Sequence, residues 1–285
     1  MRLIHVLAFA TVVAASLAHP GTARAAASYE SCTGFITSLP ALISSQGTWC
    51  LRKDLNSPQA SGEVILVDAN NVTIDCNGFK IGGLPAGPTT QAAGIASLSR
   101  LNTVVRDCNV RGFKTGIWLD GGGGHVVEDN RVEGNQDSGI VAASTTAIIR
   151  RNQVLDSGAV AAYMGSAIYV SGTVDVIDNT IDGVAPISDD YRHAAGIRTT
   201  ALQEAVISGN RVRGLVPAGG GVSFGVINHD VGAVHVRDNH LFADGAPGST
   251  GVYCTSDRQL VTDNRMTGFD VGYSTCTGYD NLETK

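Results

Sequence analysis

The residues best suited to chemistry lie together near the middle of the chain. Asp189 and Asp190 are adjacent carboxylates, and His193 and Arg198 follow within nine residues. Carboxylates beside an imidazole can act as general acid and base, and a carboxylate pair is the usual apparatus of glycoside hydrolysis. The same carboxylates could instead hold Ca²⁺, the one cofactor that we consider. If the protein is an enzyme, we expect Asp189, Asp190, His193 and Arg198 to be catalytic. The alternative is a solvated polar loop.

A second group of residues suits the binding of a sugar chain. Aromatic rings stack on the C–H faces of sugars, and directed polar groups bind their hydroxyls. Such residues recur at matching positions of successive repeats, although Ala167 competes with Tyr169 for one of these positions. The alternative is a stripe of surface aromatics that β propensity alone favours. The expected substrate-binding residues are Trp118, Asp120, Tyr163, Tyr169, His229 and Tyr253.

The elements that position these residues are predicted by a recurring asparagine. It lies each time between short apolar runs, and Cys108 takes its place one repeat earlier. From Cys108 onward the spacings are 22, 22, 27, 31, 29 and 25 residues. A period of this size indicates a solenoid, in which stacked amides can hydrogen-bond from coil to coil. The asparagines are Asn130, Asn152, Asn179, Asn210, Asn239 and Asn264.

A glycine precedes each asparagine slot by 13 or 14 residues and mostly opens a β-run. From each slot to the next glycine the count varies from 8 to 17, so the length variation falls at one corner of each coil. We therefore predict an all-β, single-domain coil of three short parallel strands per turn, with about eight or nine turns. The expected bounds are a cap over residues 28–46, the coil over 47–281 and a tail over 282–285.

The N-terminus resembles a secretory signal. An apolar run from Leu3 to Ala18 follows Arg2, and small residues follow as far as Ala27. A membrane anchor is the alternative, but the run is short for a bilayer span. Removal of residues 1–27 takes away two arginines and no acid, so the net charge changes from -6 to -8. We expect a secreted or periplasmic protein that has no stable membrane anchor and does not bind nucleic acid, since that binding depends on cationic neutralisation of phosphate.

The six cysteines form sequence-local pairs, as expected in an oxidising compartment. We predict the disulfides Cys32–Cys50, Cys76–Cys108 and Cys254–Cys276. Free buried thiols are the alternative for the middle pair, whose two Asp-Cys-Asn triplets fall on adjacent coils. No cysteine or histidine spacing is typical of a metal site.

The segments from Gly47 to Leu55 and from Ala69 to Ile81 resemble the first coils of the right-handed parallel β-helix repeat family, and the resemblance extends over about residues 35–280. This family belongs to the pectate-lyase-like superfamily, which includes NosD-like periplasmic proteins. The resemblance implies a right-handed parallel β-helix. It leaves the activity open, because the superfamily contains lyases, hydrolases, esterases and epimerases. The Arg-x-Lys of polygalacturonase-like enzymes and the Asp-Pro-His of alginate-epimerase-like enzymes are absent.

Two functions are therefore expected. The first is the binding or processing of a polysaccharide in a groove on one face of the helix, with lyase or hydrolase chemistry if the protein is an enzyme. The second is a non-catalytic structural or protein-interaction role in the cell envelope. The sequence does not specify the oligomeric state.

Overall fold

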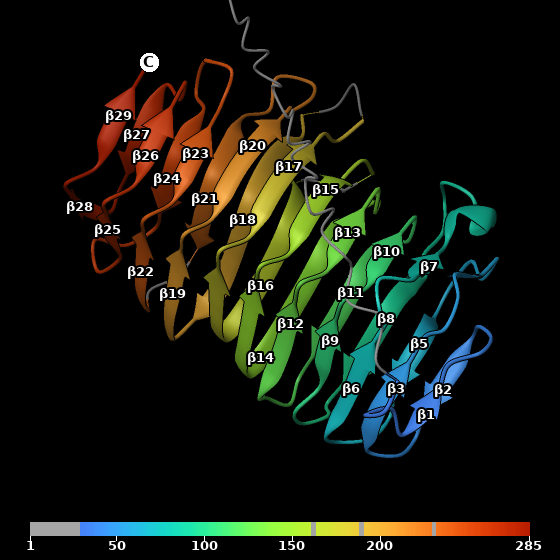
Figure 1. Cartoon of the computed structure of the whole chain (residues 1–285). Coiled ribbons are helices and arrows are strands. Elements are labelled where there is room, and N and C mark those ends of the chain that lie inside the picture. Colours follow the sequence, from blue (N-terminus) through green and yellow to red (C-terminus); the bar gives the residue numbers. More distant parts are fainter. Residues whose placement is uncertain (1–28, 161–163, 188–190, 230–231) are drawn as a thin grey trace, which may run out of the picture.

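The protein is a parallel β-helix. Its computed structural model describes residues 29–160, 164–187, 191–229 and 232–285. The paired strands run parallel, and each pairs with its counterpart in the next coil, so that the coils stack in chain order from the N-terminal to the C-terminal end (Figure 1). The predicted all-β coil with three strands per turn is confirmed. One short 3₁₀ helix, η1 (Leu84–Ala86), lies at a corner. None of the helices in the described part is long and apolar enough to cross a membrane.

The strands fall into three rows. The first row opens each coil and consists of β2 (Ala41–Ile43), β5 (Glu63–Val67), β8 (Ala93–Leu98), β11 (Thr115–Asp120), β14 (Ser138–Arg150), β16 (Met164–Ile177), β18 (His193–Leu202), β21 (Ser223–His229), β24 (Thr250–Cys254) and β27 (Val271–Ser274). The second row consists of β1 (Gly34–Phe35), β3 (Gly47–Cys50), β6 (Val72–Asp75), β9 (Val104–Arg106), β12 (His125–Glu128), β19 (Glu204–Ser208), β22 (Ala233–Arg237), β25 (Leu260–Thr262), β28 (Thr277–Tyr279) and the C-terminal halves of β14 and β16.

The third row forms a separate sheet of ten strands. These are β4 (Leu55–Asn56), β7 (Lys80–Gly82), β10 (Asn109–Arg111), β13 (Arg131–Glu133), β15 (Gln153–Ser157), β17 (Thr180–Val184), β20 (Arg211–Leu215), β23 (His240–Phe242), β26 (Arg265–Thr267) and β29 (Leu282–Thr284). Aliphatic side chains from all three rows fill the interior, so the core is a continuous column of Val, Ile and Leu.

The asparagines are buried and hydrogen-bonded from coil to coil. Asn179, for example, accepts bonds on Oδ1 from both the backbone N–H and the Nδ2 of Asn152, each at 3.0 Å. Its own Nδ2 donates to the Ile149 carbonyl and to Asn210 Oδ1. Each buried amide thus finds its partners in neighbouring coils, which offsets the cost of burying it.

The last strand extends the helix further than expected. β29 pairs with β26, and Asn281 accepts a bond from Asn264 Nδ2 at 3.0 Å. The prediction that residues 282–285 form a tail is therefore corrected: Leu282 to Thr284 add a strand to the third row. An Asp-Asn pair at 280–281, like those of earlier coils, is the sequence signal for this extra rung. The predicted cap over residues 28–46 stays a prediction, and the predicted signal over residues 1–27 lies outside the described residues.

The glycine that precedes each asparagine position mostly lies at a bend, where the backbone comes close to the opposite sheet and to the next coil. A Cβ at Gly116 would lie 2.6 Å from Val132 Cγ1 of the opposite sheet and 2.7 Å from the Gly139 carbonyl of the next coil. Gly116 and the following Ile117 therefore both face the interior, and the strand bends between them. One repeat departs from the expected register. Ala167 rather than Gly165 takes this place, since Ile140 pairs with Ile168.

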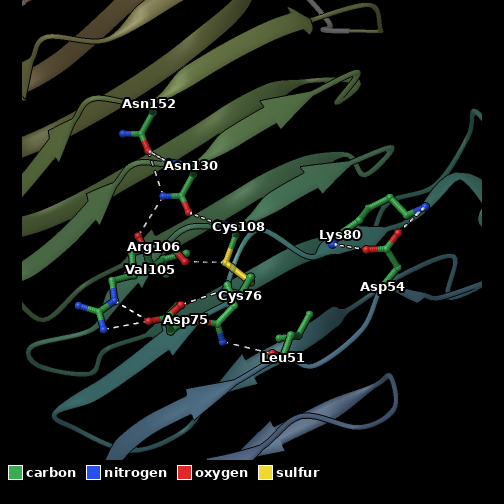
Figure 2. The surroundings of a disulfide bond; sticks show 11 residues. Leu51, Asp54, Asp75, Cys76, Lys80, Val105, Arg106, Cys108, Asn130 and Asn152 are labelled. Carbon is green, nitrogen blue, oxygen red and sulfur yellow. Dashed lines mark hydrogen bonds and ion pairs between the residues drawn. A yellow bond between two sulfur atoms is a disulfide. The ribbon is translucent and has the colours of Figure 1, made fainter. Parts of the chain in front are cut away.

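All three predicted disulfides are present. Figure 2 shows Cys76 and Cys108 bridging two coils at the head of the asparagine file, with their Cα atoms 4.6 Å apart. The backbone N–H of Cys108 donates to Asn130 Oδ1 at 3.0 Å, so the disulfide and the file are continuous (Figure 2). The alternative of free thiols at this pair is thereby excluded.

Several of the residues that directly precede the asparagine positions are aspartates with a positive φ angle. The pKa values of two of these aspartates shift in opposite directions. Burial and the neighbouring Asp75 and Asp129 raise the pKa of Asp107, whereas hydrogen bonds from Arg151 lower the pKa of Asp129. At pH 7 we expect Asp107→Asn to raise the thermal unfolding midpoint and Asp129→Asn to lower it, because asparagine tolerates the same backbone conformation.

The pH dependence of this pair follows from the two shifts. The ionised form of Asp107 is disfavoured by folding, so its penalty grows as the pH rises through the ordinary value of 3.8 to the raised pKa. The contribution of Asp129 is present above 3.8 and is lost as the pH falls through its lowered pKa. Both differences from the wild type should therefore shrink in thermal melts at acid pH. Midpoint shifts of the same sign at pH 7 would contradict this assignment.

Candidate functional site

A groove of about 600 Å³ runs across the outer face of the first row, from β5 to β18. Its floor includes one predicted column of outward residues, in which Trp118 pairs with Val141, Val141 with Tyr169, and Tyr169 with Arg198. The register thus places Tyr169 in the column, while Ala167 is fully buried. The groove spans six rungs from Glu63 to the coil of Arg198, and the five intervals between them measure about 24 Å at the usual strand spacing. This length suits an extended ligand.

Arg198 presents a charged group that forms no ion pair with any described residue. Its guanidinium carbon lies 5.2 Å from the centroid of the Tyr169 ring, and the Tyr169 hydroxyl is held by the Thr200 hydroxyl at 2.7 Å. No described residue hydrogen-bonds to Arg198 Nε, which is buried. A ligand in the groove could instead accept hydrogen bonds from the terminal nitrogens of this guanidinium, which the aromatic ring holds in place.

Three further charged residues line the groove: Glu63, Lys114 and Asp137. They are partly buried, and none of the ion pairs between described residues includes any of them or Arg198. Elsewhere on the helix, arginines pair with acids along the coils, as Arg150 does with Glu128 at 2.7 Å. Within the described part of the chain, the groove therefore holds charges of both signs that pair with no other charged residue.

These three residues were not among those predicted from the sequence. Lys114 and Asp137 lie in the corners just before β11 and β14, and Glu63 precedes Val64, which takes the place of the glycine in its coil. Because glycine and the following aliphatic residue both face inward, the residue before the glycine also faces out, as Thr115 and Ser138 do in the groove lining. Lys114 and Asp137 directly precede these two residues. The recurring Gly-Ile dipeptide, in which two successive residues face the core, is the sequence signal for this break in alternation.

His193 lies beside the groove, packed among aromatic rings, but is not part of the groove lining. Its ring centroid is 4.8 Å from that of Tyr191 and 5.6 Å from that of Phe224, and its Nδ1 accepts the Val222 N–H at 3.2 Å. Its strand partner Met164 lines the groove. Burial lowers the pKa of His193, so the imidazole is neutral at pH 7.

This burial gives a prediction for His193. Below the ordinary pKa of 6.5 the unfolded chain binds a proton that the folded protein resists, so stability falls as the pH drops through 6.5 towards the lowered folded value. His193→Gln should reduce the loss of thermal stability between pH 7.5 and 5. His235, whose pKa is also lowered, should account for part of the remaining slope. An unchanged slope in His193→Gln melts would count against this reading.

The remaining predicted site residues are dispersed. Asp120 and His229 lie two residues further along their strands, in the exposed column that continues through Ala143, Ser171 and Thr200, and they do not line the groove. Tyr253 packs on Phe224 with ring centroids 5.7 Å apart, over a small cluster that includes Ile227. Ile227, the strand partner of Arg198, is buried in this cluster although it lies in the same column as the groove residues.

Three predicted residues, Asp189, Asp190 and Tyr163, lie outside the described residues, so their roles stay predictions. The possible calcium site stays a prediction too. The described residues contain no cluster of three or more acidic, histidine or cysteine side chains placed to hold a metal ion.

Comparison with known proteins identifies the family. The model of the right-handed β-helix region matches residues 55–212 and 105–266, which together cover most of the chain, and the protein belongs to this family. The right-handed parallel β-helix implied by the resemblance is thereby confirmed. No curated protein matches the sequence.

Solved structures with the same fold differ widely in sequence. The Dettilon tailspike protein aligns with a TM-score of 0.53 at 14% identity, over 88% of this chain and 60% of the tailspike. An alginate lyase from Paenibacillus aligns with a TM-score of 0.38 at 14% identity, over 84% of this chain and 91% of the lyase. The catalytic domain of a GH87 α-1,3-glucanase in complex with nigerose gives 0.43 at 12% identity, over 89% and 62%. This chain thus spans about three fifths of the tailspike and of the glucanase domain, and the likeness establishes the fold alone.

Proposed function

We propose that this β-helix binds an extended polysaccharide along the groove of the first row. The observation that carries the proposal is the combination of aromatic faces at Trp118 and Tyr169 with the Arg198 guanidinium, which no described acid pairs with, in one groove about 24 Å long. Rings supply apolar faces for sugar rings, and the charged groups supply directed hydrogen bonds to hydroxyl or acidic groups. The names of similar structures, an alginate lyase and a glucanase, are in keeping with a carbohydrate ligand.

The charged side chains divide the groove along its length into acidic and basic regions, which favour different groups on a ligand. Glu63 lies three coils from Ser138, the neighbour of Asp137, and Lys114 falls on the coil between Ala93 and Ser138. Arg198 lies two coils beyond Val141. Successive units of one long ligand would therefore meet an acid, a cation, an acid and a cation. Charged groups spaced this far apart are better placed to bind several sugar units than to flank a single glycosidic bond.

Cleavage of the bound chain is a separate question from binding. We propose that, if it occurs, Asp189 and Asp190 act as the acid and base, with Arg198 holding the substrate and His193 contributing from beside the groove. Incubation with the bound polymer, followed by detection of new reducing ends or of unsaturated products, tests this chemistry. Activity that persists in Asp189→Asn and Asp190→Asn would reject those roles without affecting the binding proposal.

Binding itself is tested with a panel of uncharged and acidic polysaccharides by affinity electrophoresis. We expect Arg198→Gln to weaken binding of the retained polymer by about ten-fold or more, because hydrogen bonds to a charged group contribute about 1.5–3 kcal/mol. Arg213→Gln, an exposed arginine of β20 outside the groove lining, is the control. Retention of no polysaccharide, or equal retention by Arg198→Gln and wild type, would reject the proposal.

We also propose that the protein acts outside the cytoplasm. Its three disulfides, one of them fully within the core, support an oxidising compartment. Mass measurement of the mature protein recovered from the periplasm or medium tests this, and it also locates the cleavage site of the predicted signal.

A further inference from the structure

The last coil of the β-helix has an open edge. Its strands β27, β28 and β29 lie at one end of the stack (Figure 1), and each pairs with a strand of the preceding coil. No described strand pairs with any of the three on the other side. An unpaired edge presents a row of backbone N–H and C=O groups that can template a strand of another molecule. The last coil also exposes the end of the core column, to which a further coil could add.

The inward positions of the last coil differ from those of the coils before it. In every coil from β5–β7 to β24–β26, one inward position of each row holds a buried Val, Ile, Leu or Met in register with its neighbours. In the last coil a tyrosine, a glycine and a glutamate take these three positions. We call Tyr273, Gly278 and Glu283 the end lid. The register pairs, with the preceding coil named first, are Val252 with Tyr273, Val261 with Gly278, and Met266 with Glu283.

Tyr273 lies across the open end of the core. The space for its ring comes from Gly278, because a Cβ at Gly278 would lie 2.7 Å from Tyr273 Cζ. The Tyr273 hydroxyl donates to the Gly278 carbonyl at 3.3 Å, which fixes the ring over the second row. The ring packs against the core and stays partly exposed. A valine at position 278, like Val261 in the coil before, would displace the ring, so the two residues act together.

Glu283 holds a carboxylate where the earlier coils hold an apolar side chain. In the preceding coil Met266 packs on Gly251 of the first row, and its Cγ would lie 2.9 Å from a Cβ there. Glu283 lies on Gly272 in the same way, with its Cγ 2.6 Å from such a Cβ. Met266 is buried, whereas Glu283 is exposed. A coil stacked on the last one would therefore cut the Glu283 carboxylate off from water.

We infer that the end lid keeps the β-helix from joining end to end with a second copy of itself. Stacking of another coil would bury the Glu283 carboxylate against apolar side chains, and no ion pair between described residues would neutralise it. Burial of an unpaired charge is strongly unfavourable. The added coil would also meet the Tyr273 ring in place of the aliphatic column. Inward-pointing charges protect the open edges of β-sheets in this way.

The last coil is fixed to its neighbour, so the end lid is a stable part of the fold. Cys276, just before β28, is bonded to Cys254 of β24 in the preceding coil. The Asn281 amide donates to the Val261 carbonyl at 2.9 Å. A coil that contacts only one neighbour is otherwise the first to fray. The disulfide and the amide therefore hold the end lid over the core.

The test gives the last coil the inward residues of the coil before it. The variant Tyr273→Val/Gly278→Val/Glu283→Met is compared with the wild type by sedimentation velocity, with all disulfides intact. We expect the weight-average mass of the variant to rise with concentration to about twice that of the wild type or more. The maximum dimension in small-angle X-ray scattering should rise in step, because the copies add along the helix axis. Circular dichroism and thermal melts check that both proteins are folded.

Single substitutions keep the inference testable if the triple variant folds poorly. Glu283→Met removes the charge and leaves the Tyr273 ring in place, so it should self-associate measurably, although less than the triple variant. Thr284→Met adds the same side chain at the next position of β29, which faces outward, and should leave the mass unchanged.

Two results would overturn the inference: equal masses of Glu283→Met and Thr284→Met, or a folded triple variant with the mass of the wild type. Self-association that widens the particle without lengthening it would also overturn the inference, since that contact would lie on a side of the helix. None of these measurements depends on the polysaccharide groove.

Discussion

Replacement of Asn179 by alanine is expected to lower the free energy of unfolding by about 2–6 kcal/mol. The side chain takes part in four hydrogen bonds with Ile149, Asn152 and Asn210. Its removal leaves the buried Asn152 backbone N–H and the buried Ile149 carbonyl without these partners, at about 1–3 kcal/mol each. Because each coil contacts only its neighbours, the loss weakens both interfaces of one coil in the middle of the stack.

Chemical denaturation measures this effect. Gln153→Ala, at an exposed position next to Asn152, is the control and should change the unfolding free energy by no more than about 0.5 kcal/mol. The reduced midpoint in Asn179→Ala should appear with little change in the far-ultraviolet circular dichroism of the folded state. A loss smaller than about 1 kcal/mol would show that neighbouring amides or water replace the missing bonds.

Replacement of Trp118 by alanine is expected to weaken polysaccharide binding by about thirty-fold or more, which corresponds to about 2 kcal/mol. Trp118 is half-buried in the groove floor, on the same column as Tyr169, so it presents a fixed ring face at little entropic cost. Tyr169→Ala should also weaken binding, since it removes a second face and the support of the Arg198 guanidinium.

Isothermal titration with the polymer retained in the electrophoretic panel gives these affinities. Tyr279→Ala serves as the control, because Tyr279 is an exposed aromatic residue of β28 outside the groove lining. Thermal melts of each variant separate lost contact from lost folding. A Trp118→Ala protein that folds normally and binds as the wild type does would remove the main support for the groove.

The fold could be predicted because its determinants repeat. Every asparagine position needs a buried amide between coils, and every glycine position needs a close approach of two backbones. Because both requirements recur in each coil, the register follows from their spacing alone. The repeat failed once, at Gly165, because Ala167 fits the bend in that coil and a nearby glycine in the sequence resembled the expected one. The C-terminal boundary was misplaced for a related reason, since Asn281 follows its predecessor by only 17 residues.

The site was predictable only in part. Trp118, Tyr169 and Arg198 follow from alternation along a strand, and the structure brings them together. Glu63 directly precedes Val64, which takes the place of the glycine in its coil, and Lys114 and Asp137 lie in the corners just before β11 and β14, where no strand alternation applies. The burial of Ile227 under Phe224 and Tyr253 depends on contacts between side chains of neighbouring coils. Such contacts leave no periodic trace in the sequence.

The central claim, that a polysaccharide lies on Trp118 in the groove, can be measured by fluorescence. The chain has two tryptophans, and Trp49 is held by the Ser45 carbonyl near the N-terminal end. In Trp49→Phe all tryptophan emission comes from Trp118. We predict a saturable change in this emission with the same affinity that titration calorimetry gives for the wild type. Calorimetric binding of the polymer with no change in Trp118 emission would contradict the account.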